Sequence, residues 1–269
     1  MKDPRVSITL DTARQVCAAK GAGWHLMTIA EWAAIALWCR KNGTMPKGNN
    51  NYGKDISETN LPQKAIPASK DSNGKIERVL TGSGRENWYH DETFAGIADL
   101  NGNVWEWNNG LMLNNGEILI IANNNAAANS TDVSETSTEW KAVMPDGTLV
   151  TPGTTGSLKY DIQSNKNVVS TSVSNSQYSG ITTPFGSLTA YGNIDIPEIL
   201  KALTLFPTDT NDTTWNSLTI SNSGLVISCL GGGLHTSQTG AGIFCKHLGS
   251  HSKAGNDIIG FRSAYYGIV

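Results

Sequence analysis

The 269-residue sequence predicts an α+β fold with a large share of ordered loop. Two stretches in the first 45 residues have helical periodicity, and residues 111–121 and 139–151 have the apolar–turn–apolar pattern of β-hairpins. The segments between these patterns are rich in Gly, Asn and Ser. A chain of this length can bury a substantial core without a disulfide framework.

The first predicted elements are a strand and a helix. Residues 6–10 (VSITL) alternate apolar and polar side chains, which predicts a half-buried strand. We expect a helix at 11–21, capped by Asp11 or Thr12 and ended by Gly21.

The second helix has stronger signals. Thr28 and Glu31 match the T-x-x-E capping box, and Asn42-Gly43 is a stop signal. Apolar residues recur between them at helical spacing and should face the core: Ile29, Trp32, Ala33, Ala36 and Cys39.

Loops and hairpins are predicted to follow. Residues 45–87 are polar and glycine-rich, which predicts a long ordered loop. Asn115-Gly116 and Asp146-Gly147 each lie between apolar runs and mark hairpin turns. Pro197 opens a short helix that should stop before Pro207.

The last segment begins with two strand patterns, WNSLTI and GLVISCL. From Gly231 to Tyr266 no single helix or strand period fits. This stretch holds only four charged residues but three of the five histidines, among many Gly, Ser and Thr residues.

Composition excludes several classes of protein. A net charge of −3 and a pI near 5.9 disfavour nucleic-acid binding, so we expect no nucleic-acid partner. The longest apolar runs are far shorter than the roughly 20 residues of a membrane helix, so we expect no membrane insertion. The cysteines lack C-x-x-C spacing and are expected to be buried free thiols: Cys17, Cys39, Cys229 and Cys245.

Three motifs then occur in order: GWHLMTIAEW (23–32), GIADLNGNVWEW (96–107), and LGGG (230–233) followed by IGFR (259–262). They resemble the R-L-P-T-x-x-E-W, G-x-x-D-x-x-G-N-x-W-E-W and R-G-G…G-F-R motifs of the formylglycine-generating-enzyme (sulfatase-modifying factor) family. The resemblance implies a C-type-lectin-like fold with two helices, small antiparallel sheets and abundant loop. It implies a single domain over 1–269, with 111–196 as a β-rich insertion.

One branch of this fold, the variable proteins of diversity-generating retroelements, binds ligands rather than catalysing reactions. The end of the chain resembles that branch, which implies a variable region at 229–262 that displays a hypervariable surface on a rigid scaffold. Small polar side chains with occasional aromatics also make up antibody paratopes. The residues expected to form an exposed, clustered binding surface are Gly233, His235, Thr236, Ser237, Gln238, Thr239, Cys245, His247, Gly249, Ser250, His251, Gly255 and Asp257.

The motif around residue 100 has two interpretations. In the enzymes of the family the positions matching Asp99, Gly102, Val104 and Glu106 surround a calcium ion, and hard oxygen ligands suit that metal. Alternatively, both carboxylates accept hydrogen bonds from backbone amides of the turn and no cofactor is required. Trp105 and Trp107 are expected to be core residues that lock the loops.

A ligand-displaying variable protein would not be an enzyme. Two other functions are alternatives to this one. A copper-dependent oxidase of the formylglycine-generating type needs a pair of nearby cysteines, but Cys245 and Cys229 are sixteen residues apart. A calcium-dependent lectin would carry the Glu-Pro-Asn and Trp-Asn-Asp signatures, which the sequence lacks.

The resemblance also implies a partner and a place. The ligand is expected to be a protein or glycan on another cell, bound at a phage or prophage tail tip or at a bacterial surface. The first ten residues lack a signal-peptide apolar region, which favours the virion, where homo-oligomers are common.

Overall fold

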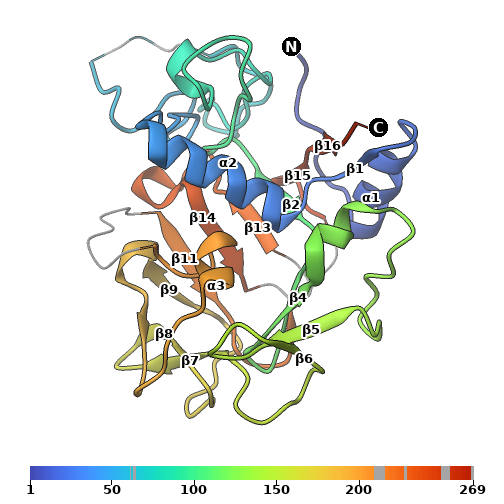
Figure 1. Ribbon diagram of the computed structural model, residues 1–269. Coiled ribbons are helices and arrows are strands. Elements are labelled where there is room, and N and C mark those ends of the chain that lie inside the picture. Colours follow the sequence, from blue (N-terminus) through green and yellow to red (C-terminus); the bar gives the residue numbers. More distant parts are fainter. Residues whose placement is uncertain (61, 63–64, 209–215, 227–228, 250–254, 268–269) are drawn as a thin grey trace.

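The computed structural model describes residues 1–60, 62, 65–208, 216–226, 229–249 and 255–267. In this part of the chain there are three α-helices and sixteen strands, so the regular secondary structure is mostly β-sheet (Figure 1). The α+β class expected from the sequence is therefore confirmed.

Six of the described strands form a mixed sheet in the order β15-β2-β13-β14-β11-β9. Strand β2 pairs antiparallel with β13 on one side and parallel with β15 on the other. The bounds are β2 Trp105–Asn108, β9 Ile181–Pro184, β11 Ser217–Ile220, β13 Cys229–Gly232, β14 Gly242–Leu248 and β15 Ile259–Phe261.

Eight described strands form a second sheet, with the path β10-β8-β7-β4-β3-β12 and with β5 and β6 attached beside β4. All of them except β12 come from residues 111–196, whereas β9 from that range joins the first sheet. The bounds are β3 Leu111–Asn114, β4 Glu117–Ile121, β5 Trp140–Val143, β6 Leu149–Val150, β7 Lys159–Gln163, β8 Lys166–Ser170, β10 Thr189–Ala190 and β12 Leu225–Val226.

The helices lie on and around the six-stranded sheet. Helix α2 crosses in front of β14, β13 and β2 (Figure 1), and the Trp32 indole donates a hydrogen bond to the Ile243 carbonyl (2.7 Å). The helix bounds are α1 Leu10–Ala18, α2 Ile29–Asn42 and α3 Glu198–Ala202, and the short 3₁₀ turns are Glu86–Trp88, Ala122–Ala127, Phe185–Ser187 and Gln238–Gly240. A two-stranded antiparallel sheet pairs β1 (Trp24–Leu26) with β16 (Ser263–Tyr265).

One apolar cluster joins the two large sheets. It contains Trp32 of α2, Leu111 and Ile118 of the eight-stranded sheet, and Leu218 and Phe244 of the six-stranded sheet. Because interiors are close-packed, this shared cluster couples the stability of the two sheets.

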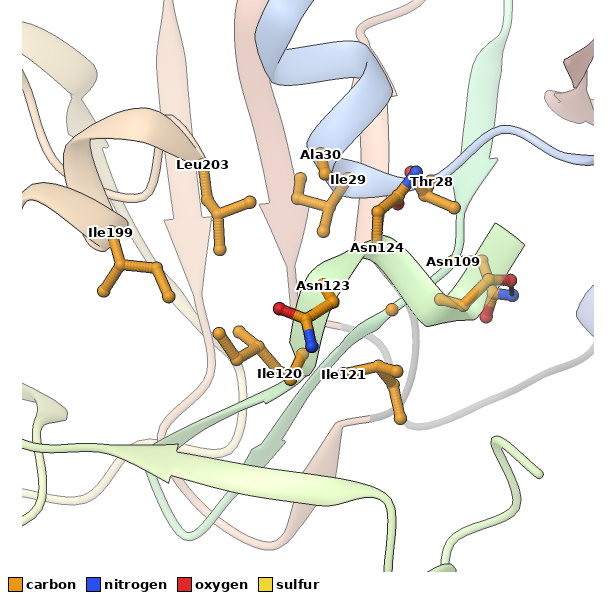
Figure 2. A pocket seen from close by; sticks show the side chains of 13 residues that line it. Thr28, Ile29, Ala30, Asn109, Ile120, Ile121, Asn123, Asn124, Ile199 and Leu203 are labelled. Carbon is orange, nitrogen blue, oxygen red and sulfur yellow. Dashed lines mark hydrogen bonds between the residues drawn. The ribbon is translucent and has the colours of Figure 1, made fainter. Parts of the chain in front are cut away.

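Residues 111–196 also contact the start of α2. The Thr28 hydroxyl donates a hydrogen bond to Asn124 Oδ1 (2.6 Å). Figure 2 shows the small cavity beside this contact, with Ile29 and Leu203 above it and Ile120 below. Its volume is about 80 Å³, well below the roughly 300 Å³ of a typical ligand pocket.

The predicted strand at 6–10 is wrong. Leu10 already belongs to α1, and the preceding backbone bonds to distant segments instead of a neighbouring strand: Ser7 N–H to the Asn256 carbonyl (2.9 Å) and the Ile8 carbonyl to the Trp107 indole (3.0 Å). Thr9, rather than Asp11 or Thr12, caps the helix. The local pattern did not reveal that tertiary partners would satisfy this backbone.

Helix α2 matches its prediction. Both hydrogen bonds of the Thr28–Glu31 capping box are present, and Gly43 ends the helix in the left-handed conformation. The five apolar residues predicted to face the core are all buried.

Both predicted hairpins are present, as β3–β4 around Asn115-Gly116 and β5–β6 around Asp146-Gly147. A third hairpin, β7–β8, was missed although it turns through Ser164 and Asn165, both with positive φ. The sequence did contain a signal for this hairpin: the Ser-Asn pair lies between two short strand-like runs, KYDIQ and KNVVS.

Other segments follow their predictions in part. No helix or regular strand lies between residues 45 and 85 among the residues described there, as expected for a long loop. Helix α3 is shorter than predicted, and Pro197 is its N-cap. GLVISCL divides between β12 and β13, which belong to different sheets.

Cys17, Cys39 and Cys245 are buried free thiols, as predicted, while the Cys229 side chain lies outside the described part of the chain. The apolar run GEILIIA contributes β4. Within the described ranges, no helix combines the length and the apolar character needed to cross a membrane.

Candidate functional site

Glu106 lies at the centre of the site because it is the residue of β2 that pairs with both neighbouring strands, β13 and β15. Its register partner in β13 is Gly231, and its partner in β15 is Gly260. The candidate variable region therefore starts at β13, on one side of β2, and ends at β15, on the other side of β2. Both strands are paired with β2 at Glu106. We call the segment between these two anchors, from residue 233 to residue 258, the excursion; within it, Gly242–Leu248 form β14, which pairs with β13 and β11.

The Glu106 carboxylate is paired with Arg262. Arg262 Nε contacts Oε2 at 2.5 Å and Nη2 contacts Oε1 at 2.6 Å, a bidentate arrangement. The guanidinium also donates to the carbonyls of Ala98 (3.1 Å) and Asp99 (3.2 Å). Burial alone would lower the pKa of Arg262, but the charge and hydrogen bonds of Glu106, with Asp99 nearby, raise it above its ordinary value.

Asp99 is a second buried carboxyl in the same turn. Its Oδ2 accepts a hydrogen bond from the Gly82 amide (2.8 Å), and its Oδ1 has no partner within the described residues. Burial raises the pKa of Asp99 from 3.8 to about 6, although the Gly82 amide and Arg262 act in the opposite direction. The carboxyl therefore titrates close to neutral pH.

The arrangement does not fit a calcium ion at Asp99, Gly102, Val104 and Glu106. Both Glu106 oxygens are bound by the Arg262 guanidinium, which places a positive charge where the cation would need those ligands. In the described ranges, no group of three or more His, Cys, Asp or Glu side chains is arranged to hold a metal. The second interpretation, that amides of the turn bind both carboxylates, is wrong: the amide that Asp99 binds belongs to Gly82, outside the turn, and the partner of Glu106 is the Arg262 side chain.

The two tryptophans of the motif differ in burial. Trp107 is fully buried, and its indole donates to the Ile8 carbonyl, so the expected core role is confirmed. Trp105 is only half-buried, and its ring meets the His247 imidazole edge to face at 5.6 Å. Trp105 therefore borders the candidate variable region as well as the core.

The candidate binding residues are unevenly exposed. Thr236, Gln238, Thr239 and Asp257 are exposed. Ser237, His247, Gly249 and Gly255 are half-buried, whereas Gly233, His235 and Cys245 are buried. Ser250 and His251 lie outside the described residues.

The expected exposure of Gly233, His235 and Cys245 is therefore wrong. Cys245 lies within β14, between two neighbouring strands, and its thiol contacts the Ser217 hydroxyl (3.4 Å). His235 is covered because its ring packs against Tyr52, with ring centroids 5.7 Å apart. Neither the strand nor the covering loop could be inferred from the Gly/Ser/Thr-rich composition of the region.

Burial sets the protonation states of Cys245, His235 and His247. Burial raises the pKa of the Cys245 thiol to about 11, so in the absence of a metal the thiol stays protonated at neutral pH. Burial lowers the pKa values of His235 and His247, so both imidazoles are neutral at pH 7.

Sequence reasoning missed the loop that lies beside this region. Tyr52 N–H donates to the His235 carbonyl (3.0 Å), and Gln238 N–H donates to the Asn50 carbonyl (2.9 Å). Lys75 lies beside Tyr52, with its ammonium 4.8 Å from the centre of the Tyr52 ring. No local signal could identify these residues, because more than 150 positions separate them from the region they contact.

The chain matches no protein-family model and no curated protein. Function is therefore inferred from the geometry of the site and from the three sequence motifs.

Proposed function

We propose that the chain is a ligand-binding variable protein of the diversity-generating-retroelement type. In this proposal a C-type-lectin-like scaffold of the formylglycine-generating-enzyme type presents residues of the candidate variable region to a protein or glycan partner. The protein acts by recognition rather than catalysis, at a phage tail tip or on a bacterial surface.

The single observation that carries the proposal is the double anchoring on Glu106. Gly231 and Gly260 pair with Glu106 on its two sides through the strand register, and the Arg262 side chain, just after β15, binds the Glu106 carboxylate. We call this arrangement the base of the excursion. The hydrogen bonds at these two anchors are made by backbone groups, which every residue except proline carries, and Thr236, Gln238 and Asp257 are exposed side chains between them. Residues such as Thr236, Gln238 and Asp257 can therefore change while the base of the excursion stays in place.

The order of the motifs supports the same function. LGGG begins in β13, and its last glycine, Gly233, starts the excursion; IGFR begins in β15 and supplies Arg262 just after that strand. The motifs thus coincide with the two anchors. The exposed residues between them are small or polar, which suits adaptable recognition.

The test is the DNA sequence next to the gene. We expect a near-copy of the coding sequence for residues 229–262 that differs at adenines, together with a reverse-transcriptase gene. A complete locus without such a copy would overturn the assignment to a diversity-generating retroelement.

A further inference from the structure

We propose that the recognition surface is composite: fixed residues Tyr52 and Lys75 complete it beside Thr236 and Gln238, and the surface binds a hydroxyl-rich saccharide. This inference rests on the proposed function, since it names the ligand class of the same surface. It adds a part of the chain that lies outside the candidate variable region.

Two backbone hydrogen bonds hold the fixed loop against the displayed segment. They join Tyr52 to His235 (3.0 Å) and Gln238 to Asn50 (2.9 Å). Tyr52 also packs edge-on against the buried His235 ring, so its ring is supported from the side of the excursion. The loop and the segment therefore form one continuous surface.

Both residues at this junction have strained backbones. Tyr52 has a φ of 50° and Gln238 a φ of 48°, in the left-handed region that bulky side chains rarely adopt. Glycine would adopt this conformation more readily. Strain of this kind concentrates at ligand sites, where the side chain is needed in that position.

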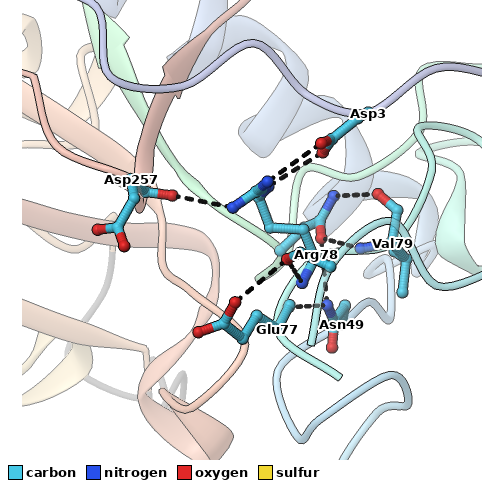
Figure 3. Close-up of polar contacts among 8 residues, drawn as sticks. Asp3, Asn49, Glu77, Arg78, Val79 and Asp257 are labelled. Atoms are coloured by element: carbon cyan, nitrogen blue, oxygen red, sulfur yellow. Dashed lines mark hydrogen bonds and ion pairs between the residues drawn. The ribbon is translucent and has the colours of Figure 1, made fainter. Parts of the chain in front are cut away.

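A polar network fixes the loop that carries Tyr52 and Lys75 (Figure 3). Arg78 makes a bidentate pair with Asp3 (3.0 Å for each bond) and donates to the Asp257 carbonyl (3.3 Å), so it links the N-terminal segment to the end of the excursion. Asn49 donates to the Glu77 carbonyl (2.8 Å). These bonds restrain the loop before any ligand arrives, which lowers the entropic cost of binding.

The same loop is tied to the turn that precedes β2. Asn103 Oδ1 accepts hydrogen bonds from the Val79 amide (2.9 Å) and from Asn49 Nδ2 (3.1 Å), and Asn103 Nδ2 donates to the Val79 carbonyl (3.2 Å). Val79 also belongs to a small apolar cluster with Ile76 and Trp88. The loop that carries Tyr52 and Lys75 is therefore stabilised by its own apolar cluster as well as by hydrogen bonds.

The exposed groups on this surface are hydrogen-bonding groups. They are the Gln238 amide, the Thr236 and Thr239 hydroxyls, the Asp257 carboxylate and the Lys75 ammonium. The ammonium lies over the Tyr52 ring and has three N–H donors. Amides, carboxylates and ammonium groups pair with neighbouring hydroxyls, and the Tyr52 ring holds the Lys75 ammonium in position for such a bond.

A protein partner fits this surface less well. Protein interfaces derive most of their affinity from central aromatic and Arg anchors. In the described part of the chain the largest exposed apolar side chains, such as Trp38, Phe94 and Tyr265, belong to other elements. Tyr52 alone offers an aromatic anchor among the residues named here for the composite surface, and it is only half-exposed.

The experiment is binding of the purified full chain to an array of immobilised oligosaccharides, with immobilised proteins as a second arm. We expect an oligosaccharide to bind, Lys75→Ala to weaken that binding at least about threefold, and Tyr52→Ala to weaken it about tenfold, equivalent to about 1.4 kcal/mol. Tyr191→Ala, at another exposed tyrosine, is the matched control and should bind normally.

Gln238→Gly separates binding from folding. Glycine relieves the left-handed strain, so the melting temperature should stay equal or rise while oligosaccharide binding falls. Binding to proteins alone, or full oligosaccharide binding by the Tyr52→Ala and Gln238→Gly variants, overturns the inference. If the DNA next to the gene contains the near-copy that differs at adenines, these binding results would contradict only the saccharide as ligand class. The proposed function would still hold.

Discussion

Glu106 connects three parts of the chain through one residue. Its backbone lies between Gly231 and Gly260, and its side chain, only 7% exposed, binds Arg262 through both carboxylate oxygens. A buried pair of this kind loses far more when one partner is removed than an exposed pair does. The residue therefore stabilises the base of the excursion rather than acting on a ligand.

Glu106→Gln should lower the free energy of unfolding by about 3 kcal/mol, because it leaves the Arg262 charge without a counter-charge in the interior. Urea denaturation measures the change. Glu198→Gln is the matched control, since Glu198 pairs with Lys201 at 2.7 Å on the exposed face of α3 and its loss should cost less than about 0.5 kcal/mol. Equal losses in the two variants would contradict a buried role for the Glu106 pair.

Asp99 should make stability depend on pH. Its folded pKa of about 6 exceeds the ordinary value of 3.8, so the folded state binds the proton more tightly than the unfolded chain. The resulting stabilisation is complete below pH 3.8 and is lost as the pH rises through 6. Its full size is on the order of 2–3 kcal/mol.

The measurement compares wild type with Asp99→Asn by urea denaturation at pH 7.5 and pH 4.5. Using the difference between the two proteins removes the contribution of Asp161, whose lowered pKa gives the opposite pH dependence. We expect wild type to gain stability relative to Asp99→Asn as the pH falls. A difference that does not change with pH would show that Asp99 has an ordinary pKa.

Calcium should leave the protein unchanged, because Arg262 occupies both Glu106 oxygens. An ion bound at 100 times its Kd would add about 2.7 kcal/mol to the free energy of unfolding. The melting temperature in excess calcium should therefore equal that in excess chelator. A rise on adding calcium would restore the metal site at Asp99 and Glu106.

At the scale of elements, turn residues set the strand register of the hairpins. In β3–β4 the turn residues Asn115 and Gly116 both have positive φ, which suits a two-residue connection between Asn114 and Glu117. The turn also packs against neighbouring backbone, so its tolerance to substitution depends on the surroundings.

Gly116→Ala should be destabilising by about 1–3 kcal/mol, because a Cβ at this position would lie 2.6 Å from the Tyr160 carbonyl oxygen in addition to the strain of φ +81°. Gly147→Ala has similar strain, with φ +86°, but the nearest atom, in Pro197, is 3.4 Å away. Thermal unfolding of both variants should place Gly147→Ala closer to wild type. The reverse order would contradict the packing described for β3–β4.

At the scale of the whole molecule, the scaffold and the displayed residues are separable. Trp107 is fully buried in the cluster that joins α1 to β2 and β15, whereas Thr236, Gln238 and Thr239 lie at the surface. His247 lies between these extremes, half-buried against Trp105. Stability should therefore depend on the first group, and in the proposed function ligand choice depends on the second.

Trp107→Ala should cost about 3–5 kcal/mol, as expected for a large buried aromatic. Replacing Thr236 and Thr239 by Ser together should change the free energy of unfolding by less than about 0.5 kcal/mol, because both side chains are exposed. Chemical denaturation of the two variants tests the separation. A large loss from the Ser variant would show that the displayed residues are part of the core.

The sequence by itself determined the local elements. The capping box at Thr28 and Glu31, the turn chemistry at Asn115-Gly116 and the apolar spacing of α2 act through neighbours in the chain, so their signals are local. The order of the three motifs also indicated which segment is held between two anchors.

Only the tertiary structure decided which charge faces Glu106, which of the candidate residues are exposed, and which loop covers His235. Arg262 meets Glu106 across more than 150 residues of sequence, and Tyr52 reaches His235 across a similar separation. Burial and pKa depend on everything packed around a group, including segments distant in sequence, so no local pattern could predict them.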